Sequence, residues 1–184
     1  MARDAPSPSF QAKATRLRLL LFDVDGVLTN GKVVLHADGS ESKQFHIRDG
    51  TAIVLAHRAG LLTGFLSARA SPSTLRRASQ LSVAIVSQGV TSKLDTYEQI
   101  LREHDLQNQD VAFMGDDLLD LPVLARVGMS AAPADAVDEV QSSVEWVSVA
   151  RGGEGAVREF VEAVLRAQNR WQAVVDGYLG DTGP

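Results

Sequence analysis

A chain of 184 residues, 45% of them hydrophobic and 22% charged, is long enough to bury one sizeable core as a globular domain. Its net charge of -5 at pH 7 gives no sign of a nucleic-acid or membrane-surface partner, and the absence of cysteine excludes disulfides and thiolate metal sites. No apolar run approaches the length of a membrane span and the N-terminus lacks a secretory signal, so we expect a cytoplasmic protein.

Residues 1–16 show no periodic pattern and are expected to form a loose N-terminal tail. A run of apolar residues then predicts a buried strand over 17–23. Two short β-prone stretches follow, joined around Asp38-Gly39, a pair that is typical of a tight turn between antiparallel strands. We therefore predict a β-hairpin inserted over 31–47, shortly after the first strand.

From the hairpin onward the sequence alternates between helical and strand patterns. Asp49 is placed to cap the first of these helices, and the glycine-rich run 152–155 is interpreted as a flexible loop before the last one. The expected helices cover residues 50–59, 72–81, 93–104, 118–127, 135–141 and 154–168. The expected strands cover residues 61–66, 83–86, 111–114, 129–131 and 144–147.

Short strands that are apolar on both faces and alternate with helices predict an α/β fold, a Rossmann-like open parallel sheet sandwiched by helices. No insertion is long enough to make a large cap domain. We expect a single domain over 17–170, followed by a C-terminal tail over 171–184. Trp171, Tyr178 and Leu179 in that tail are either docking residues or part of a disordered end.

Ligands of an open parallel sheet bind beyond the carboxyl ends of its strands. Polar residues gather at that edge of the predicted sheet: Asp23, Asp25, Ser67, Arg69, Lys93, Asp116, Asp117 and Asp120. Clustered carboxylates repel one another, so we expect a divalent cation, and an all-oxygen site suits Mg²⁺. Asp116 is expected to complete the metal site, while Asp117 and Asp120 support water or Lys93 there.

A hydroxyl and a lysine beside such a metal are what a bound phosphoryl group needs, which predicts phosphoryl chemistry. Asp23 can be the nucleophile that forms an aspartyl-phosphate. Asp25 can protonate the leaving alkoxide and then take a proton from the attacking water. Ser67 and Lys93 are expected to hold the phosphoryl oxygens, and Lys93 also offsets the charge of the nucleophile.

In this order the residues resemble the four motifs of the haloacid dehalogenase superfamily of aspartate-based phosphatases: Asp23-Val24-Asp25-Gly26-Val27-Leu28-Thr29, Ser67, Lys93 and Gly115-Asp116-Asp117-Leu118-Leu119-Asp120. Further stretches are similar to the 3-deoxy-D-manno-octulosonate 8-phosphate phosphatase family: His46-Ile47-Arg48-Asp49-Gly50, Gln88-Gly89, 117–123 and 151–159. The resemblance covers nearly the whole of the chain from residue 18 to residue 171.

The resemblance implies a phosphatase of lipopolysaccharide biosynthesis that converts this small anionic sugar phosphate to the free sugar acid and phosphate. It implies a homotetramer without a cap domain, in which the hairpin lids a neighbour's active site and the C-terminal tail can approach one. It implies Mg²⁺ binding by the carboxylates of Asp23 and Asp116 and by the main-chain carbonyl of Asp25. It also implies a set of substrate or phosphate contacts: Thr29, Arg48, Asp49, Gly50, Arg69, Arg77 and Lys93.

Two positions depart from the family pattern, Val54 where a basic residue is usual and His46 where a small polar residue is common. They keep another substrate class open, a different sugar-acid or small sugar phosphate. A non-enzymatic receiver-like phospho-acceptor module also combines an acceptor aspartate, an acidic pair and a lysine. Its motif order is the reverse of this one, because here the acceptor Asp23 comes first. Mutase chemistry is a third alternative. It normally needs a cap that shields the phosphoenzyme from water, and no insertion in this sequence is long enough to form one.

Overall fold

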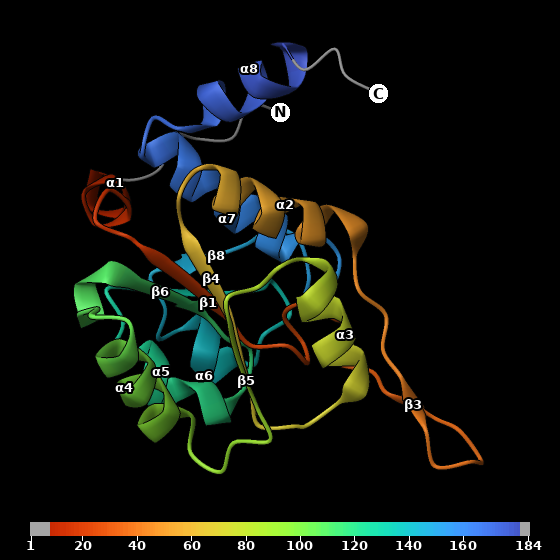
Figure 1. Ribbon diagram of the computed structural model, residues 1–184. Coiled ribbons are helices and arrows are strands. Elements are labelled where there is room, and N and C mark those ends of the chain that lie inside the picture. Colours follow the sequence, from red (N-terminus) through yellow and green to blue (C-terminus); the bar gives the residue numbers. More distant parts are fainter. Residues whose placement is uncertain (1–7, 181–184) are drawn as a thin grey trace.

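A six-stranded parallel sheet with the strand order β5-β4-β1-β6-β7-β8 forms the centre of the computed structural model, which describes residues 8–180. The strands are β1 (Leu19–Phe22), β4 (Leu62–Ser67), β5 (Ile85–Gln88), β6 (Val111–Met114), β7 (Met129–Ala132) and β8 (Trp146–Val147). Helices cover both faces of this sheet (Figure 1). The open α/β sandwich expected from the sequence is therefore confirmed.

The helices are α1 (Pro8–Ala14), α2 (Ile47–Arg58), α3 (Pro72–Gln80), α4 (Lys93–Glu103), α5 (Leu121–Leu124), α6 (Asp138–Gln141), α7 (Ala156–Ala167) and α8 (Trp171–Gly180), with short 3-10 turns η1 (Asn108–Asp110) and η2 (Leu118–Asp120). Successive side chains of β1 point to opposite faces. Leu20 and Phe22 join a core cluster with α1, α2, α3 and α7, whereas Leu19 and Leu21 join another with α4, α5 and α6. None of the helices within residues 8–180 is long and apolar enough to span a membrane.

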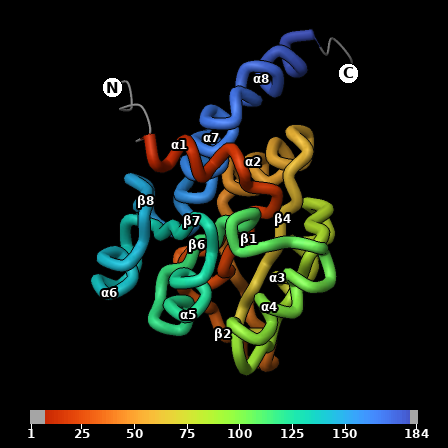
Figure 2. The backbone as a smooth tube through the Cα atoms, turned by 90° about the vertical axis from the view of Figure 1, so that its left-hand side faces the viewer, coloured from red at the N-terminus to blue at the C-terminus, as the bar shows by residue number. Residues whose placement is uncertain are grey.

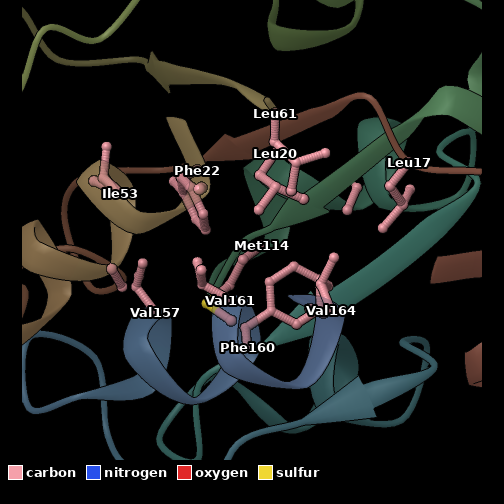
Figure 3. Close-up of a cluster of buried hydrophobic side chains, with 14 of the residues drawn as sticks. Leu17, Leu20, Phe22, Ile53, Leu61, Met114, Val157, Phe160, Val161 and Val164 are labelled. Atoms are coloured by element: carbon pink, nitrogen blue, oxygen red, sulfur yellow. The ribbon is translucent and has the colours of Figure 1, made fainter. Parts of the chain in front are cut away.

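The amphipathic helix α7 closes the larger core cluster. Its apolar residues recur at helical spacing and are fully buried: Val157, Phe160, Val161 and Val164. Figure 3 shows them gathered with Leu20, Phe22 and Met114 of the two central strands. Burial of each such side chain stabilises the fold by about 1.5–3 kcal/mol, and this layer supports β1 and β6 directly below the edge that carries the acids.

The N-terminal segment differs from the prediction of a loose tail. Residues 8–14 form α1, and its Phe10 and Ala14 are buried in the larger core cluster. Gln168, just after α7, donates a hydrogen bond of 2.7 Å from Nε2 to the carbonyl of Ala14. A helix of seven residues is too short to show a clear period in the sequence, and docking rather than propensity stabilises it. Residues 1–7 of the expected tail lie outside the described part.

The C-terminal segment also contains a helix, α8, which Figure 2 shows running on from the end of α7 and away from the sheet. Val174 is buried, and the guanidinium of Arg58 lies 4.5 Å from the ring centroid of Tyr178. Tyr178 and Leu179 are both exposed, whereas Trp171 packs against the larger core cluster. Residues 181–184 lie outside the described part.

The predicted hairpin is present and projects from the rest of the molecule (Figure 1). Its strands β2 (Val34–Leu35) and β3 (Glu41–Ser42) pair in antiparallel fashion. In the turn, Asp38 Oδ1 accepts a hydrogen bond of 2.9 Å from the N–H of Ser40, and Gly39 adopts a φ of +83°. Both residues of β2 are exposed, so the hairpin presents apolar surface away from the core.

Candidate active site

The register of the sheet brings the predicted strand-end residues to one edge. At the end of β1, Phe22 pairs with β4 on one side and with β6 on the other. Asp23 follows directly, and its N–H donates a hydrogen bond of 2.9 Å to the carbonyl of Met114. Ser67 ends β4, is buried, and accepts a hydrogen bond of 3.3 Å at Oγ from the N–H of Arg69. The acidic loop that follows β6 therefore starts beside Asp23.

Lys93 connects two of the acids. Its Nζ lies 2.7 Å from Asp23 Oδ1 and 2.5 Å from Asp120 Oδ1, and all three residues are buried. Lys93 is the first residue of α4, where Ser92 Oγ accepts a hydrogen bond of 3.2 Å from the N–H of Asp95 and caps the helix. Burial lowers the pKa of Lys93, but the two carboxylates outweigh burial and raise it, so the ammonium stays charged.

Asp120 shapes the acidic loop as well as holding the lysine. Its Oδ2 accepts hydrogen bonds from the N–H of Asp116 at 2.9 Å and from the N–H of Asp117 at 3.3 Å. Gly115 permits this close fold, because a Cβ there would lie 2.5 Å from Cβ of Asp120. Asp117 is exposed and caps η2 through a 2.7 Å hydrogen bond from the N–H of Leu118. Of the two acids expected to support water or Lys93, Asp120 is the one that contacts the lysine.

The carboxylates of Asp23, Asp116 and Asp120 offer oxygens that all lie within 4.8 Å of one another. Both oxygens of Asp120 already accept hydrogen bonds, whereas Asp116 Oδ1 is buried and accepts none from residues 8–180. Burial raises the pKa of Asp23 to about 7, against the effect of Lys93, and it raises the pKa of Asp116 to about 8 with help from the neighbouring acids. An excess of buried acid around one ammonium, with an unused oxygen, fits a divalent cation.

Asp25 faces cations from two other segments. Lys43, which follows β3 of the hairpin, donates a hydrogen bond of 2.8 Å to Asp25 Oδ2. Arg69, after β4, places Nε 3.8 Å from the same oxygen and forms an ion pair of 2.9 Å with Glu41. Lys43 and Glu41 were not among the predicted site residues. The sequence does contain a signal for them: they lie two positions apart on the second arm of the predicted hairpin, so their side chains are expected on the same face.

A packed glycine loop supports the turn that carries the first two acids. Gly26 adopts a φ of +98°, and a Cβ there would lie 1.9 Å from Asp116 Oδ2. A Cβ on Gly152 would lie 1.6 Å from the carbonyl oxygen of Gly26, and the N–H of Gly153 donates a hydrogen bond of 2.9 Å to the carbonyl of Val27. The interpretation of 152–155 as a flexible loop is therefore wrong, because only glycine allows this backbone contact.

Asp49 and Thr29 lie in the backbone framework around the site. Asp49 was predicted to cap the helix that follows it, but α2 begins earlier and contains it. Its carboxylate instead accepts hydrogen bonds from the N–H of Gly155 at 3.1 Å and of Arg158 at 2.8 Å, at the start of α7. Thr29 is fully buried and donates a hydrogen bond of 3.3 Å to the carbonyl of Val24. For both residues, a contact with substrate stays a prediction.

The other predicted substrate residues lie on α2 and α3. Arg48, in the first turn of α2, is exposed, and its side chain forms no hydrogen bond or ion pair with any residue that the structure describes. Arg77 of α3 lies 5.9 Å from the ring centroid of Phe45. Gly50 leaves room for it, since a Cβ there would lie 2.1 Å from Arg77 Nη2. Val54 is half-buried and packs against the core.

Comparison with known proteins places this site in a family. A family model of haloacid dehalogenase-like hydrolases matches residues 61–160. The 3-deoxy-D-manno-octulosonate 8-phosphate phosphatase of Salmonella typhimurium is 35% identical over 164 residues, which make up 89% of this chain and 87% of that relative.

Solved structures lead to the same family. The crystal structure of the phosphatase of that name from Yersinia pestis has a TM-score of 0.89 at 34% identity and covers 91% of this chain and 90% of its own. That from Moraxella catarrhalis, in complex with magnesium ion, phosphate ion and KDO molecule, has a TM-score of 0.91 at 27% identity and covers 94% of this chain and 99% of its own. The chain is therefore a phosphatase of the haloacid dehalogenase-like hydrolases and belongs to the 3-deoxy-D-manno-octulosonate 8-phosphate phosphatase family.

Proposed function

We propose that this chain is a Mg²⁺-dependent phosphomonoester hydrolase that works through an aspartyl-phosphate on Asp23. The observation that carries the proposal is the charge arrangement at the sheet edge, where Lys93 lies between Asp23 and Asp120 and Asp116 keeps a buried oxygen without a hydrogen bond from residues 8–180. A carboxylate held by an ammonium, beside an acid with an unused oxygen, is what phosphoryl transfer to an aspartate requires.

The donor set fits Mg²⁺, which prefers oxygen ligands and tolerates few protein ligands in its shell. Asp23 and Asp116 would hold the ion by their carboxylates and Asp25 by its main-chain carbonyl. The magnesium ion in the structure of the Moraxella catarrhalis relative supports this choice. When bound, Mg²⁺ supplies positive charge that offsets the acids and the phosphoryl oxygens.

In the first step an oxygen of Asp23 attacks the phosphorus atom, and the bond from phosphorus to the sugar oxygen breaks. The electron pair of that bond stays on the sugar oxygen, which takes a proton from Asp25. Lys93 and the hydroxyl of Ser67 hold the phosphoryl oxygens while their charge is redistributed. The products of this step are the free sugar acid, an aspartyl-phosphate on Asp23 and an ionised Asp25.

In the second step Asp25 takes a proton from a water molecule whose oxygen attacks the same phosphorus atom. The bond from phosphorus to the Asp23 oxygen breaks, and its electron pair restores the carboxylate. Phosphate leaves, and both acids return to their starting protonation states. Lys93 again offsets the charge of Asp23, which makes the carboxylate a better leaving group.

We propose 3-deoxy-D-manno-octulosonate 8-phosphate as the substrate. The relatives that are named as phosphatases of this compound align with this chain over most of their own length, which supports the choice. The molecule has a carboxylate besides its phosphate, and Arg48 and Arg69 are exposed cations that could receive it. A homotetramer would bring a neighbour's hairpin over the site. The exposed apolar residues Val34 and Leu35 on β2 support such a contact.

The test is hydrolysis of a panel of sugar phosphates, including several 2-keto-3-deoxy acids, compared by kcat/KM. We expect the eight-carbon acid to rank first, EDTA to abolish turnover, and Mg²⁺ to restore it. Asp23→Asn should lower kcat by at least about 1,000-fold, because the nucleophile is lost. Activity that persists in Asp23→Asn contradicts the mechanism, whereas a better substrate elsewhere in the panel contradicts only the choice of sugar.

A further inference from the structure

The return strand of the hairpin carries two charged residues at alternate positions, Glu41 and Lys43. Side chains two residues apart on an extended strand lie on the same face, and here both reach the active-site edge. The side chain of Lys43 is completely buried, although it belongs to a projecting hairpin. A buried ammonium is costly unless a partner compensates for the lost water, so the partner of Lys43 identifies its role.

That partner is Asp25. Nζ of Lys43 donates a hydrogen bond of 2.8 Å to Asp25 Oδ2 and lies 2.7 Å from Oδ1, which accepts no hydrogen bond from the described chain. Asp25 sits on the turn after β1, beside Gly26 with its φ of +98°, where the main chain is not part of a regular element. The orientation of its carboxylate therefore depends on side-chain partners.

A second cation, Arg69, lies near Asp25 but does not form the hydrogen bond that Lys43 forms. Arg69 Nε lies 3.8 Å from Asp25 Oδ2, too far for a hydrogen bond, while its Nη2 is held at 2.9 Å by Glu41. Half of the Arg69 side chain is exposed, whereas that of Lys43 is not. Among the described residues, Lys43 is thus the one that fixes the Asp25 carboxylate by a hydrogen bond.

We propose that Lys43 is a positioning residue for the phosphatase reaction, which lies within 2.8 Å of both carboxylate oxygens of Asp25 and so fixes the orientation of this carboxylate for proton transfer. This rests on the proposed role of Asp25 as acid and base. Loss of Lys43 leaves Asp25 chemically intact but free to rotate, and proton transfer depends on its orientation. The hairpin is then part of the catalytic apparatus of its own subunit, whatever it contacts in a neighbour.

The test compares Lys43→Met with the wild type on two substrates, the best sugar phosphate of the panel and para-nitrophenyl phosphate. The sugar alkoxide needs a proton in order to leave, whereas the nitrophenolate leaves without one. We expect kcat/KM to fall about 10- to 100-fold for the sugar phosphate and less than about 3-fold for the aryl phosphate. Lys43→Arg should restore most of the loss, and Lys32→Met, at an exposed lysine on the other arm of the hairpin, should match the wild type.

Asp25→Asn is measured beside these variants and should show the same dependence on the leaving group. Equal losses on both substrates in Lys43→Met would make the lysine merely structural, and a rise in KM alone would make it a substrate contact; either result overturns the proposal. If Lys43→Met does not fold, Lys43→Gln is judged by the same criteria. Full activity of Asp25→Asn on the sugar phosphate would contradict the proposed mechanism itself, while an inactive Asp25→Asn beside an unaffected Lys43→Met would overturn only the positioning role.

Discussion

Asp120 holds the lysine with one oxygen and the acidic loop with the other. Oδ1 accepts from Lys93, and Oδ2 accepts from the N–H groups of Asp116 and Asp117. A carboxylate can accept on both sides, but an amide has a donor group on one of them. The negative charge of Asp120 and its two acceptor oxygens are therefore both required for the site.

We predict that Asp120→Asn lowers kcat about 10- to 100-fold, because Lys93 or the acidic loop must shift when an N–H donor faces another donor. The free energy of unfolding, measured in urea, should fall by about 1–3 kcal/mol for the same reason. Asp117→Asn is the matched control. Asparagine caps a helical turn as well as aspartate, so its activity should stay within about 3-fold of the wild type. The opposite ranking of the two variants would contradict the assignment of the lysine support to Asp120.

The residues that the sequence could predict are those whose place follows from their own element. Asp23 follows a buried strand and Lys93 begins a helix, so the rule for parallel sheets was enough to bring them to one edge. The partners of Asp25 and Asp49 could not be predicted in this way. Lys43 is 18 positions from Asp25, and Gly155 is 106 positions from Asp49, so those contacts depend on the path of the hairpin and on the packing of α7.

At the scale of elements, one buried carboxylate joins α2 to α7. Asp49, in the first turn of α2, accepts two hydrogen bonds from N–H groups at the start of α7 and so caps a helix that begins about a hundred residues later. Burial raises its pKa. Gly155, one of the donors, ends the glycine loop that packs on the turn around Gly26. The contact between Asp49 and the start of α7 therefore lies between the core helices and the active-site turn.

We predict that Asp49→Ala lowers the free energy of unfolding by about 1–3 kcal/mol, because two main-chain N–H groups lose a buried acceptor. Asp49→Asn keeps one side-chain oxygen and should lose about half as much or less. Urea unfolding measures both. KM of Asp49→Asn distinguishes this framework role from the predicted contact with substrate, because loss of framework support alone leaves KM at the wild-type value. A large rise in KM with unchanged stability would instead show that Asp49 contacts the substrate.

Elements with a clear local signal were predicted from the sequence, and short or docked ones were not. The Asp38-Gly39 turn predicted the hairpin, and the helical pattern over 154–168 predicted α7. The helix α1 escaped prediction because seven residues carry too little periodicity. The start of α2 was misplaced because Asp49 has the chemistry of a cap, but it serves another helix.

At the scale of the whole molecule, the fold concentrates acid at one edge of the sheet. Asp23, Asp116 and Asp120 surround the single ammonium of Lys93, so the site carries excess negative charge before any cation binds. The sequence predicted this concentration because every parallel strand delivers its following loop to the same edge. The arrangement of subunits depends on contacts between different chains, which a single chain does not contain. The homotetramer therefore stays a prediction.

This excess of acid makes the free energy of unfolding depend on pH, and the direction of the change follows from the pKa values. Without metal, the pKa of Asp23 is about 7 and that of Asp116 about 8, whereas an unfolded aspartate titrates near pH 4. Between about pH 4 and pH 8 the folded chain then binds more protons than the unfolded one, so these two groups lower the free energy of unfolding as the pH rises. In the proposed site Mg²⁺ needs both carboxylates ionised, so we expect its binding to displace protons and to weaken as the pH falls below about 7.

We therefore predict that Mg²⁺ raises the unfolding temperature more at pH 8 than at pH 6, measured by thermal unfolding against EDTA-treated protein. At pH 7, calorimetric titration in two buffers of different ionisation enthalpy should show release of roughly one to two protons for each ion bound. Asp116→Asn should lose most of the Mg²⁺ effect at both pH values, because it removes the negative charge of a proposed ligand whose Oδ1 accepts no hydrogen bond from residues 8–180. An effect of Mg²⁺ that is independent of pH and releases no proton would place the cation away from Asp23 and Asp116.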